Sequence, residues 1–383
     1  MKVKNYRYAI ERRAPSLLLL ALGIEHMYRR QWKPTASALF AALALGFFEP
    51  QPHANPTAST VRDGQHDFDF IIGRWKVHLR RKAEGSDVWT ESDGFGVYRK
   101  VWGGRANLNE FFTNSPSGHV EGLTLRTYNP QTHQWSLYWA NSRDGILSSA
   151  QVGQFTHGQG EFYAQDNSDG RNLLVRYVWS KITATSAHFE QALSTDGGRS
   201  WDVDWISDMA RTGDAEPAVT TGEGTANEKP GQRDFEPILG RWNYRLQRRL
   251  RPLTGSNNWV SLNGTGECTP LWGGRAQLDT FNADGSTGHI EGLTLRLFNP
   301  KTQEWRLYWA NSKDGLVVSP QIGHFEAGHG EFYAQDTLDD RSILTKYDWS
   351  ALHSSSPHFE QSFSNDGGKS WEANWITDQS RVK

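Results

Sequence analysis

The second half of this sequence repeats the first. The motif WGGRA occurs at 102–106 and again at 272–276, and the motif EGLTLR occurs at 121–126 and again at 291–296. Both pairs are 170 residues apart. A period of this length is too long for a solenoid unit and is the size of a domain with its own core. The 383-residue chain therefore contains two related globular domains in tandem.

The repeat also sets the domain boundaries. The first copy covers residues 66–211, and the second copy covers residues 233–381. The segment 212–232 between them is rich in Gly, Thr, Ala, Glu and Pro and poor in aromatic residues. Such a composition is typical of a flexible linker. We expect two domains of about 145 residues, connected by this segment.

Residues 1–54 take no part in the repeat and have the pattern of a leader. An uncharged, mostly apolar run at 35–48 follows a basic stretch and precedes a polar, proline-containing one. This order is typical of a secretory signal peptide, and Met27 is a candidate true start. The run is too short to span a bilayer as a helix. We expect a periplasmic or secreted protein, with an uncleaved membrane anchor as the alternative.

Composition limits the classes of function. The chain has 41 Lys and Arg against 43 Asp and Glu, so nothing in its charge points to nucleic acid. Its 17 tryptophans predict large aromatic surfaces in cores or pockets. The one cysteine, Cys268, excludes an intrachain disulfide. Its counterpart in the first copy is Tyr98, which argues against a thiol nucleophile.

Within each copy, apolar and polar residues alternate in short runs separated by turn residues. We expect hairpins over residues 124–141, over a pair of runs that ends at 172–180, and over 188–206. No long helical pattern competes with them. Many short strands at regular spacing indicate an antiparallel sandwich or barrel, and closing into a barrel hides the sheet edges. The sequence thus predicts an all-β fold.

Each copy begins with a Gly-x-Trp motif, which ends at Trp75 and Trp242, and each copy ends at an arginine, Arg211 and Arg381. This combination resembles the calycin superfamily of lipocalin-like closed β-barrels. The resemblance implies two tandem calycin-like barrels, in which each terminal arginine covers the indole ring by a cation–π contact. These four residues are therefore expected to be structural. Both copies also contain the motifs DFxxxxGxW, NPxTxxW and DGGxSW. With these motifs the chain resembles a bacterial family of calycin-like domains that has no settled activity.

A second short motif occurs once in each copy and ends at Trp201 and Trp371. It matches the Asp-box of sialidases and related propellers, where an aspartate and a serine fix a hairpin turn. A propeller would carry the motif about once in every blade, whereas here it occurs once in 170 residues. We interpret it as a structural turn, with a sialidase-like propeller as the alternative.

One face of a predicted strand carries candidate ligand-binding residues. Thr124, Arg126 and Tyr128 point to the same side by strand alternation. An arginine beside these hydroxyl groups inside a barrel would bind a carboxylate or a carbonyl oxygen. Arg296 repeats Arg126, and the next strand adds an apolar contact at Trp139 and Trp309. The alternative is that this face meets solvent.

A second candidate site pairs a histidine with a carboxylate. His188 and Glu190 point the same way on one strand, and the second copy repeats them as His358 and Glu360. Such a pair inside a barrel would serve as a general acid and base. No HxH or HExxH spacing occurs, so no metal is expected. The alternative is a structural histidine.

Three functions agree with these patterns. The first is a binding protein that holds a small apolar or amphipathic molecule in Trp-rich cavities. The second is a cofactor-independent enzyme, namely an isomerase, cyclase, hydratase or hydrolase that uses the His, Glu and Arg set. The third is a structural module with filled barrels. We rank binding first. We expect no cofactor, no nucleic-acid partner and no stable membrane span in the mature chain. The two repeats could also pair with each other within the chain.

Overall fold

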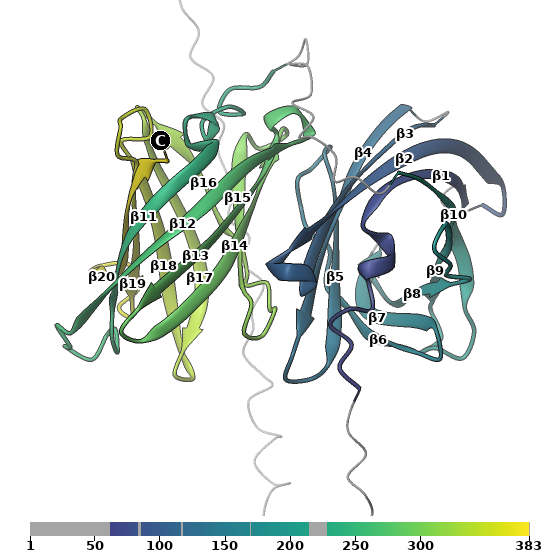
Figure 1. The fold of residues 1–383 in the computed structure, drawn as a ribbon, viewed down its shortest axis with the longest axis horizontal. Coiled ribbons are helices and arrows are strands. Elements are labelled where there is room, and N and C mark those ends of the chain that lie inside the picture. The colour runs from purple at the N-terminus through teal and green to yellow at the C-terminus, as the bar shows by residue number, and fades with distance from the viewer. Residues whose placement is uncertain (1–61, 83–85, 116–117, 169, 214–227, 383) are drawn as a thin grey trace, which may run out of the picture. The chain divides into compact units, whose positions relative to one another are not determined.

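Figure 1 shows the computed structural model of the chain, which describes residues 62–82, 86–115, 118–168, 170–213 and 228–382. Residues Thr60–Lys383 form one compact unit. The predicted leader and most of the predicted linker, residues 214–227, lie outside the described residues. In the part of the chain that is described, no helix has the length and apolar character needed to cross a membrane.

The first repeat forms a closed barrel of ten antiparallel strands (Figure 1). The last strand pairs with the first, with Arg211 opposite Trp75, and this pairing closes the sheet. Closure removes the unpaired edges that an open sheet would expose. The strands are β1 (Gly73–Lys82), β2 (Trp89–Val101), β3 (Ala106–Ser115), β4 (Gly118–Asn129), β5 (Gln134–Asn141), β6 (Gln151–Thr156), β7 (Gln159–Ser168), β8 (Arg171–Ser180), β9 (Ser186–Ser194) and β10 (Asp202–Gly213).

The second repeat forms a second closed barrel with the same order of strands. Arg381 lies opposite Trp242 where its last strand pairs with its first. The two barrels confirm the predicted all-β fold of tandem antiparallel barrels. The strands are β11 (Gly240–Arg249), β12 (Trp259–Leu271), β13 (Ala276–Gly285), β14 (Gly288–Asn299), β15 (Glu304–Asn311), β16 (Gln321–Glu326), β17 (His329–Leu338), β18 (Arg341–Ser350), β19 (His358–Ser364) and β20 (Glu372–Arg381).

The Asp-box motif forms the turn between β9 and β10. The Asp196 carboxylate accepts hydrogen bonds from the backbone N–H groups of Arg199 and Ser200, at 2.9 and 3.0 Å, and from the Ser200 hydroxyl at 2.7 Å. The bonds from Ser200 lower the pKa of Asp196 to about 2. The motif thus serves as a structural turn between neighbouring barrel strands.

One end of each barrel is closed by the residues around the Gly-x-Trp motif. Trp75 is fully buried, and its indole N–H donates to the Ile71 carbonyl at 2.6 Å. The Arg211 guanidinium carbon lies 4.5 Å from the Trp75 ring centre. In the second barrel, the guanidinium carbon of Arg381 lies 4.2 Å from the Trp242 ring centre. Each barrel therefore has the cation–π contact that the resemblance to calycins implies.

A phenylalanine from the segment before the first strand fills the same end of each barrel. Phe68 is 1% exposed and its ring centre lies 5.0 Å from those of Trp135 and Phe155. Phe235 occupies the equivalent place in the second barrel, 5.2 Å from Trp305. Edge-to-face contacts of this kind add to the apolar area that the rings bury. Phe68 and Phe235, which we call the plug residues, close one end of the interior of each barrel.

The outer face of β4 packs against its counterpart in the second repeat. Leu123 and Leu125 belong to one buried cluster with Leu293 and Leu295 of β14. All four side chains are 0% exposed. The two repeats therefore share an apolar interface inside the Thr60–Lys383 unit. Intramolecular pairing of the repeats, one of the options from the sequence, is present.

Polar contacts across this interface occur in reciprocal pairs. Arg105 of the first repeat forms an ion pair with Glu291 of the second, and Arg275 of the second forms one with Glu121 of the first. Reciprocity of this kind is the property of an isologous, two-fold interface. The same pattern holds for two tyrosine hydroxyls that accept backbone N–H bonds, Tyr138 from Val317 at 3.4 Å and Tyr308 from Leu147 at 3.2 Å.

Candidate functional site

Both barrels contain an internal cavity. The cavity of the second barrel has a volume of about 390 Å³, and the cavity of the first has a volume of about 90 Å³. Small-molecule sites typically measure roughly 300–1,000 Å³. The second cavity falls in that range, whereas the first has room for only a small group of atoms.

Apolar side chains, many of them aromatic, provide most of the wall of both cavities, with polar and charged groups among them. In the second barrel the aromatic lining comprises Tyr244, Phe281, Trp309, Tyr347, Trp349, Phe359, Phe363 and Trp375. In the first barrel it comprises Tyr98, Phe111, Trp139, Tyr177, Trp179, Phe189 and Trp205. Concave aromatic walls with few polar groups are characteristic of binding sites for apolar and amphipathic molecules.

A buried arginine forms the floor of the first cavity. Arg126 is 3% exposed, and its guanidinium carbon lies 5.3 Å from the ring centre of the plug residue Phe68. Its Nη1 donates to the side-chain oxygens of Asn107 at 3.1 Å and Asn109 at 2.9 Å. Strand alternation explains this position, because Arg126 and Thr124 face the cavity while Leu125 faces the other repeat. The structure thus places Arg126 on the wall of the first cavity.

Arg126 forms no ion pair within the described residues. Burial lowers the pKa of Arg126 to about 10, and only the neighbouring hydroxyls of Tyr98 and Tyr177 oppose that effect. Its Nε has no hydrogen-bond partner. At neutral pH the floor of the first cavity is therefore a positive charge held by amide oxygens and aromatic rings.

The same arginine in the second barrel has a counter-charge. Arg296 is 1% exposed, and its Nη2 donates to Asp279 at 2.7 Å. The Tyr244 hydroxyl donates to the other oxygen of Asp279 at 3.1 Å. Burial alone would lower the pKa of Arg296, but the Asp279 carboxylate outweighs burial and raises it. The floor of the second cavity is thus an ion pair without net charge.

The predicted tryptophans line the cavities, and a glycine makes room for each. Trp139 and Trp309 are both part of the walls. A Cβ added at Gly122 would lie 1.9 Å from Trp139, and one added at Gly292 would lie 2.1 Å from Trp309. Any larger residue at either glycine would therefore displace the ring.

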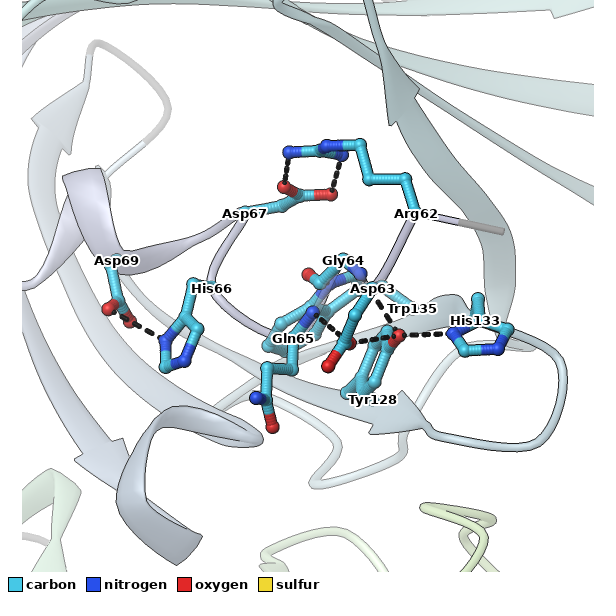
Figure 2. A network of polar contacts seen from close by, with 10 residues as sticks. All are labelled: Arg62, Asp63, Gly64, Gln65, His66, Asp67, Asp69, Tyr128, His133 and Trp135. Atoms are coloured by element: carbon cyan, nitrogen blue, oxygen red, sulfur yellow. Dashed lines mark hydrogen bonds and ion pairs between the residues drawn. The ribbon is translucent and has the colours of Figure 1, made fainter. Parts of the chain in front are cut away.

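Tyr128, predicted to bind ligand, is not among the residues that line the first cavity. Figure 2 shows the polar contacts that its hydroxyl group makes instead. Its hydroxyl donates to Asp63 at 2.7 Å, accepts from the Gly64 N–H at 3.1 Å and lies 3.0 Å from His133 Nδ1. The neighbouring Trp135 donates to the Gly64 carbonyl at 2.9 Å. Tyr128 shares the inward face with Arg126, but it lies beyond the plug. There it holds the segment that leads into the barrel.

The predicted acid–base pair does not join Arg126 in the cavity. Phe189 and Gln191 of β9 line the wall, so His188 and Glu190 point outward by alternation. His188 hydrogen bonds to Asp208 at 2.6 Å and to Glu190 at 2.8 Å. In the second barrel Phe359 and Gln361 line the wall in the same way. The convergence that an enzyme of this type requires is therefore absent from the described residues.

The equivalent outward residues of the second barrel are also engaged. His358 Nδ1 lies 2.7 Å from Asp378, and Glu360 accepts from the Ser362 hydroxyl at 2.8 Å. These contacts link β19 to β20 and along β19 itself. They agree with the structural interpretation of the histidine, which was the alternative from the sequence.

Asp279 and Tyr244 were not among the candidates from the sequence. The signal that could have found them is a difference between the copies: Asn109 and Val77 occupy the equivalent positions in the first repeat. Agreement between copies pointed to Arg126 and Arg296 but could not show that their surroundings differ. Cys268, buried and 3.6 Å from Arg296, replaces Tyr98 at a third such position.

One group of described residues has the composition of a metal site but not its surroundings. Ligand atoms of His329, Glu331 and Asp348 lie within 4.8 Å of one another. The Lys346 ammonium lies 3.6 Å from Glu331 and 3.5 Å from Asp348. A lysine already forms ion pairs with both carboxylates, and the group lies mostly exposed. It has the character of a surface ion-pair cluster.

No protein-family model matches the sequence, and no curated protein matches it. One similar solved structure is a DUF3598-family protein of unknown function from Nostoc punctiforme, at 9% identity and a TM-score of 0.23, over 84% of this chain and 100% of that one. Another is a mutant of the vaccine antigen transferrin-binding protein B from Haemophilus parasuis, at 8% identity and a TM-score of 0.14, over 81% of this chain and 76% of that one. At these TM-scores the likeness carries no argument about family or function.

Proposed function

We propose that this protein binds a small apolar or amphipathic molecule, with the cavity of the second barrel as the main site. The observation that carries the proposal is the 390 Å³ cavity with aromatic walls and an internally neutral floor. Such a wall favours an apolar body. Gln361, which donates to Asn374 at 2.6 Å, also lines the cavity and has a carbonyl oxygen that could accept a hydrogen bond from a polar group. A purely structural module would have an interior packed with side chains, whereas the side chains of this barrel leave a cavity.

The position of the histidines favours binding over catalysis. An acid–base enzyme needs its titratable groups within hydrogen-bond reach of the bound substrate. Among the described residues that line the second cavity, Asp279 is the only carboxylate, and it is already paired with Arg296 and Tyr244. That pairing suits a group that stabilises the floor.

A neutral fluorescent probe tests the proposal. We expect N-phenyl-1-naphthylamine to bind with a dissociation constant of about 1–100 μM, measured by energy transfer from the tryptophans in the wall. Thr294→Trp fills the second cavity and should abolish most of the signal. Thr124→Trp, the matched change in the smaller cavity, should leave it. Lack of uptake by the unmodified chain, or full uptake by the Thr294→Trp variant, would overturn the proposal.

Export and kinship with calycins are further parts of the proposal. The apolar run at 35–48 supports export, and the arginine stacked on Trp75 and on Trp242 supports the kinship. Fractionation of cells that express the full chain, with N-terminal sequencing of the product, tests export. An intact leader on a product in the cytoplasm would contradict it.

A further inference from the structure

Besides their volumes, the two cavities differ in the charge of their floors. In the first barrel, the side chain that lies 2.9 Å from Arg126 is Asn109, a neutral amide. In the second barrel the same position is Asp279, 2.7 Å from Arg296. A single position therefore decides whether the floor is a cation or a neutral ion pair.

A second difference supports the carboxylate in one barrel and not in the other. Tyr244 donates to Asp279, whereas the residue at its place in the first barrel is Val77, which lines the cavity without a donor. A buried carboxylate needs more than one hydrogen-bond partner. The second barrel supplies both partners, and the first barrel supplies neither the carboxylate nor the tyrosine.

We infer that the first barrel binds the anionic group of its ligand at Arg126, whereas the second barrel holds an uncharged part of its ligand at the equivalent floor. The inference rests on the proposed function and adds the chemical class of each ligand. A carboxylate is the group that fits best, because a guanidinium binds it with two parallel hydrogen bonds. Arg126 lines the cavity, and among the described residues no carboxylate forms an ion pair with it.

Other charges near the cavities lie away from the floors. In the first barrel Asp204 accepts from Gln191 at 3.1 Å, and its carboxyl is not part of the lining. In the second barrel the lining includes Arg248, Arg249 and Arg251, from the end of β11 and the loop beyond it, and Arg249 forms an ion pair with Glu372 at 3.4 Å. An anionic group could therefore reach the second cavity at that far end. A decisive measurement must report on the floors themselves.

The side-chain Nε–Hε signals of the two arginines provide that measurement. We would titrate the ¹⁵N-labelled full chain with butyrate and with butyramide, which have nearly the same shape and differ in charge. The buffer contains no carboxylate or phosphate. Arg126→Lys and Arg296→Lys assign the two signals. Because neither Nε has a partner within the described residues, each signal is free to respond to a ligand on its own floor.

We expect the Arg126 signal to report butyrate binding about tenfold or more tighter than butyramide binding, the size of one charge-assisted interaction. The Arg296 signal should show no such preference. Asn109→Asp should remove the preference from the first barrel, and Asp279→Asn should create one in the second. Circular dichroism checks that both variants fold, and the comparison of the two signals in the unmodified chain needs no variant.

Equal affinities of butyrate and butyramide at Arg126 would overturn the inference, and so would a preference that survives Asn109→Asp. Absence of any butyrate response at Arg126 would overturn it as well. Uptake of the neutral naphthylamine probe separates the two proposals. If the probe binds and the anion preference is missing, the inference alone fails; if the probe is not bound either, the proposed function fails with it.

Discussion

The same substitution in the two barrels should have very different effects on stability. Arg126→Met and Arg296→Met each remove a buried guanidinium and keep most of the side-chain volume. Arg126 has no carboxylate partner within the described residues, whereas Arg296 is paired with Asp279. The change in unfolding stability depends on whether the substitution leaves a buried charge without an ion-pair partner.

The magnitudes follow from the surroundings of each arginine. Burial lowers the pKa of Arg126 from 12.5 to about 10, which corresponds to about 3 kcal/mol against the charged form. Removing that charge offsets the loss of the two bonds to Asn107 and Asn109, worth about 1–3 kcal/mol each. These opposing contributions leave a net destabilisation between about −1 and 3 kcal/mol for Arg126→Met. Arg296→Met leaves Asp279 as an unpaired buried carboxylate and should destabilise the barrel by about 3–5 kcal/mol.

Urea unfolding followed by hydrogen exchange and mass spectrometry would measure this difference, because peptides report on each barrel separately. The double variant Arg296→Met with Asp279→Asn is the control. It removes both charges and should recover most of the lost stability, which defines a coupling energy for the pair. If Arg126→Met destabilises its barrel as much as Arg296→Met does, other groups compensate the buried charge of Arg126. The two floors would then not differ in net charge, contrary to our prediction.

Three further predictions concern the wall, the interface and a turn. Gly292→Ala should displace Trp309, lower the uptake of the naphthylamine probe and destabilise the second barrel by about 1–3 kcal/mol in urea unfolding; unchanged uptake would count against the role of the ring. Arg275→Ala removes the arginine partner of the partly buried Glu121, which keeps the Ser142 hydroxyl bond at 3.0 Å and His119 at 3.8 Å, and should lower unfolding stability by about 1–3 kcal/mol, an effect that Arg275→Lys should partly avoid. Asp196→Ala should reduce stability at pH 7, and this difference should fade as the pH falls from the usual carboxyl value of 3.8 through about 2, because the depressed pKa stabilises the folded state only above that range; a pH-independent difference would refute the assignment.

The strand pattern was predictable because alternation and turn residues are local properties. The hairpin expected over 124–141 corresponds to β4 and β5, and the one expected over 188–206 corresponds to β9 and β10. The face that carries Arg126 was also identified correctly as one set of alternating residues. The sequence could not decide whether that face was the inner one. Both faces of β4 are buried, since Leu123 and Leu125 pack against the second repeat.

Strand alternation predicts the face on which a residue lies but not its position along the barrel axis. Tyr128 shares the inward face with Arg126 but lies past Phe68, a plug contributed by a segment before the first strand. The sequence also left the orientation of His188 open, for a simpler reason. A histidine with a carboxylate two residues away occurs equally on either face, and only the contacts of Phe189 with the cavity settle which face it is.

The reciprocal interface between the repeats has a consequence for how the two cavities could have diverged. In a symmetric dimer of one barrel, every change at the floor would appear in both subunits at once. Here the two copies lie on a single chain, so Asp279 can exist in one cavity while Asn109 remains in the other, and Arg105 and Arg275 still bind their glutamates across the same contact. Covalent fusion keeps the pairing symmetric and leaves each cavity free to select a different ligand.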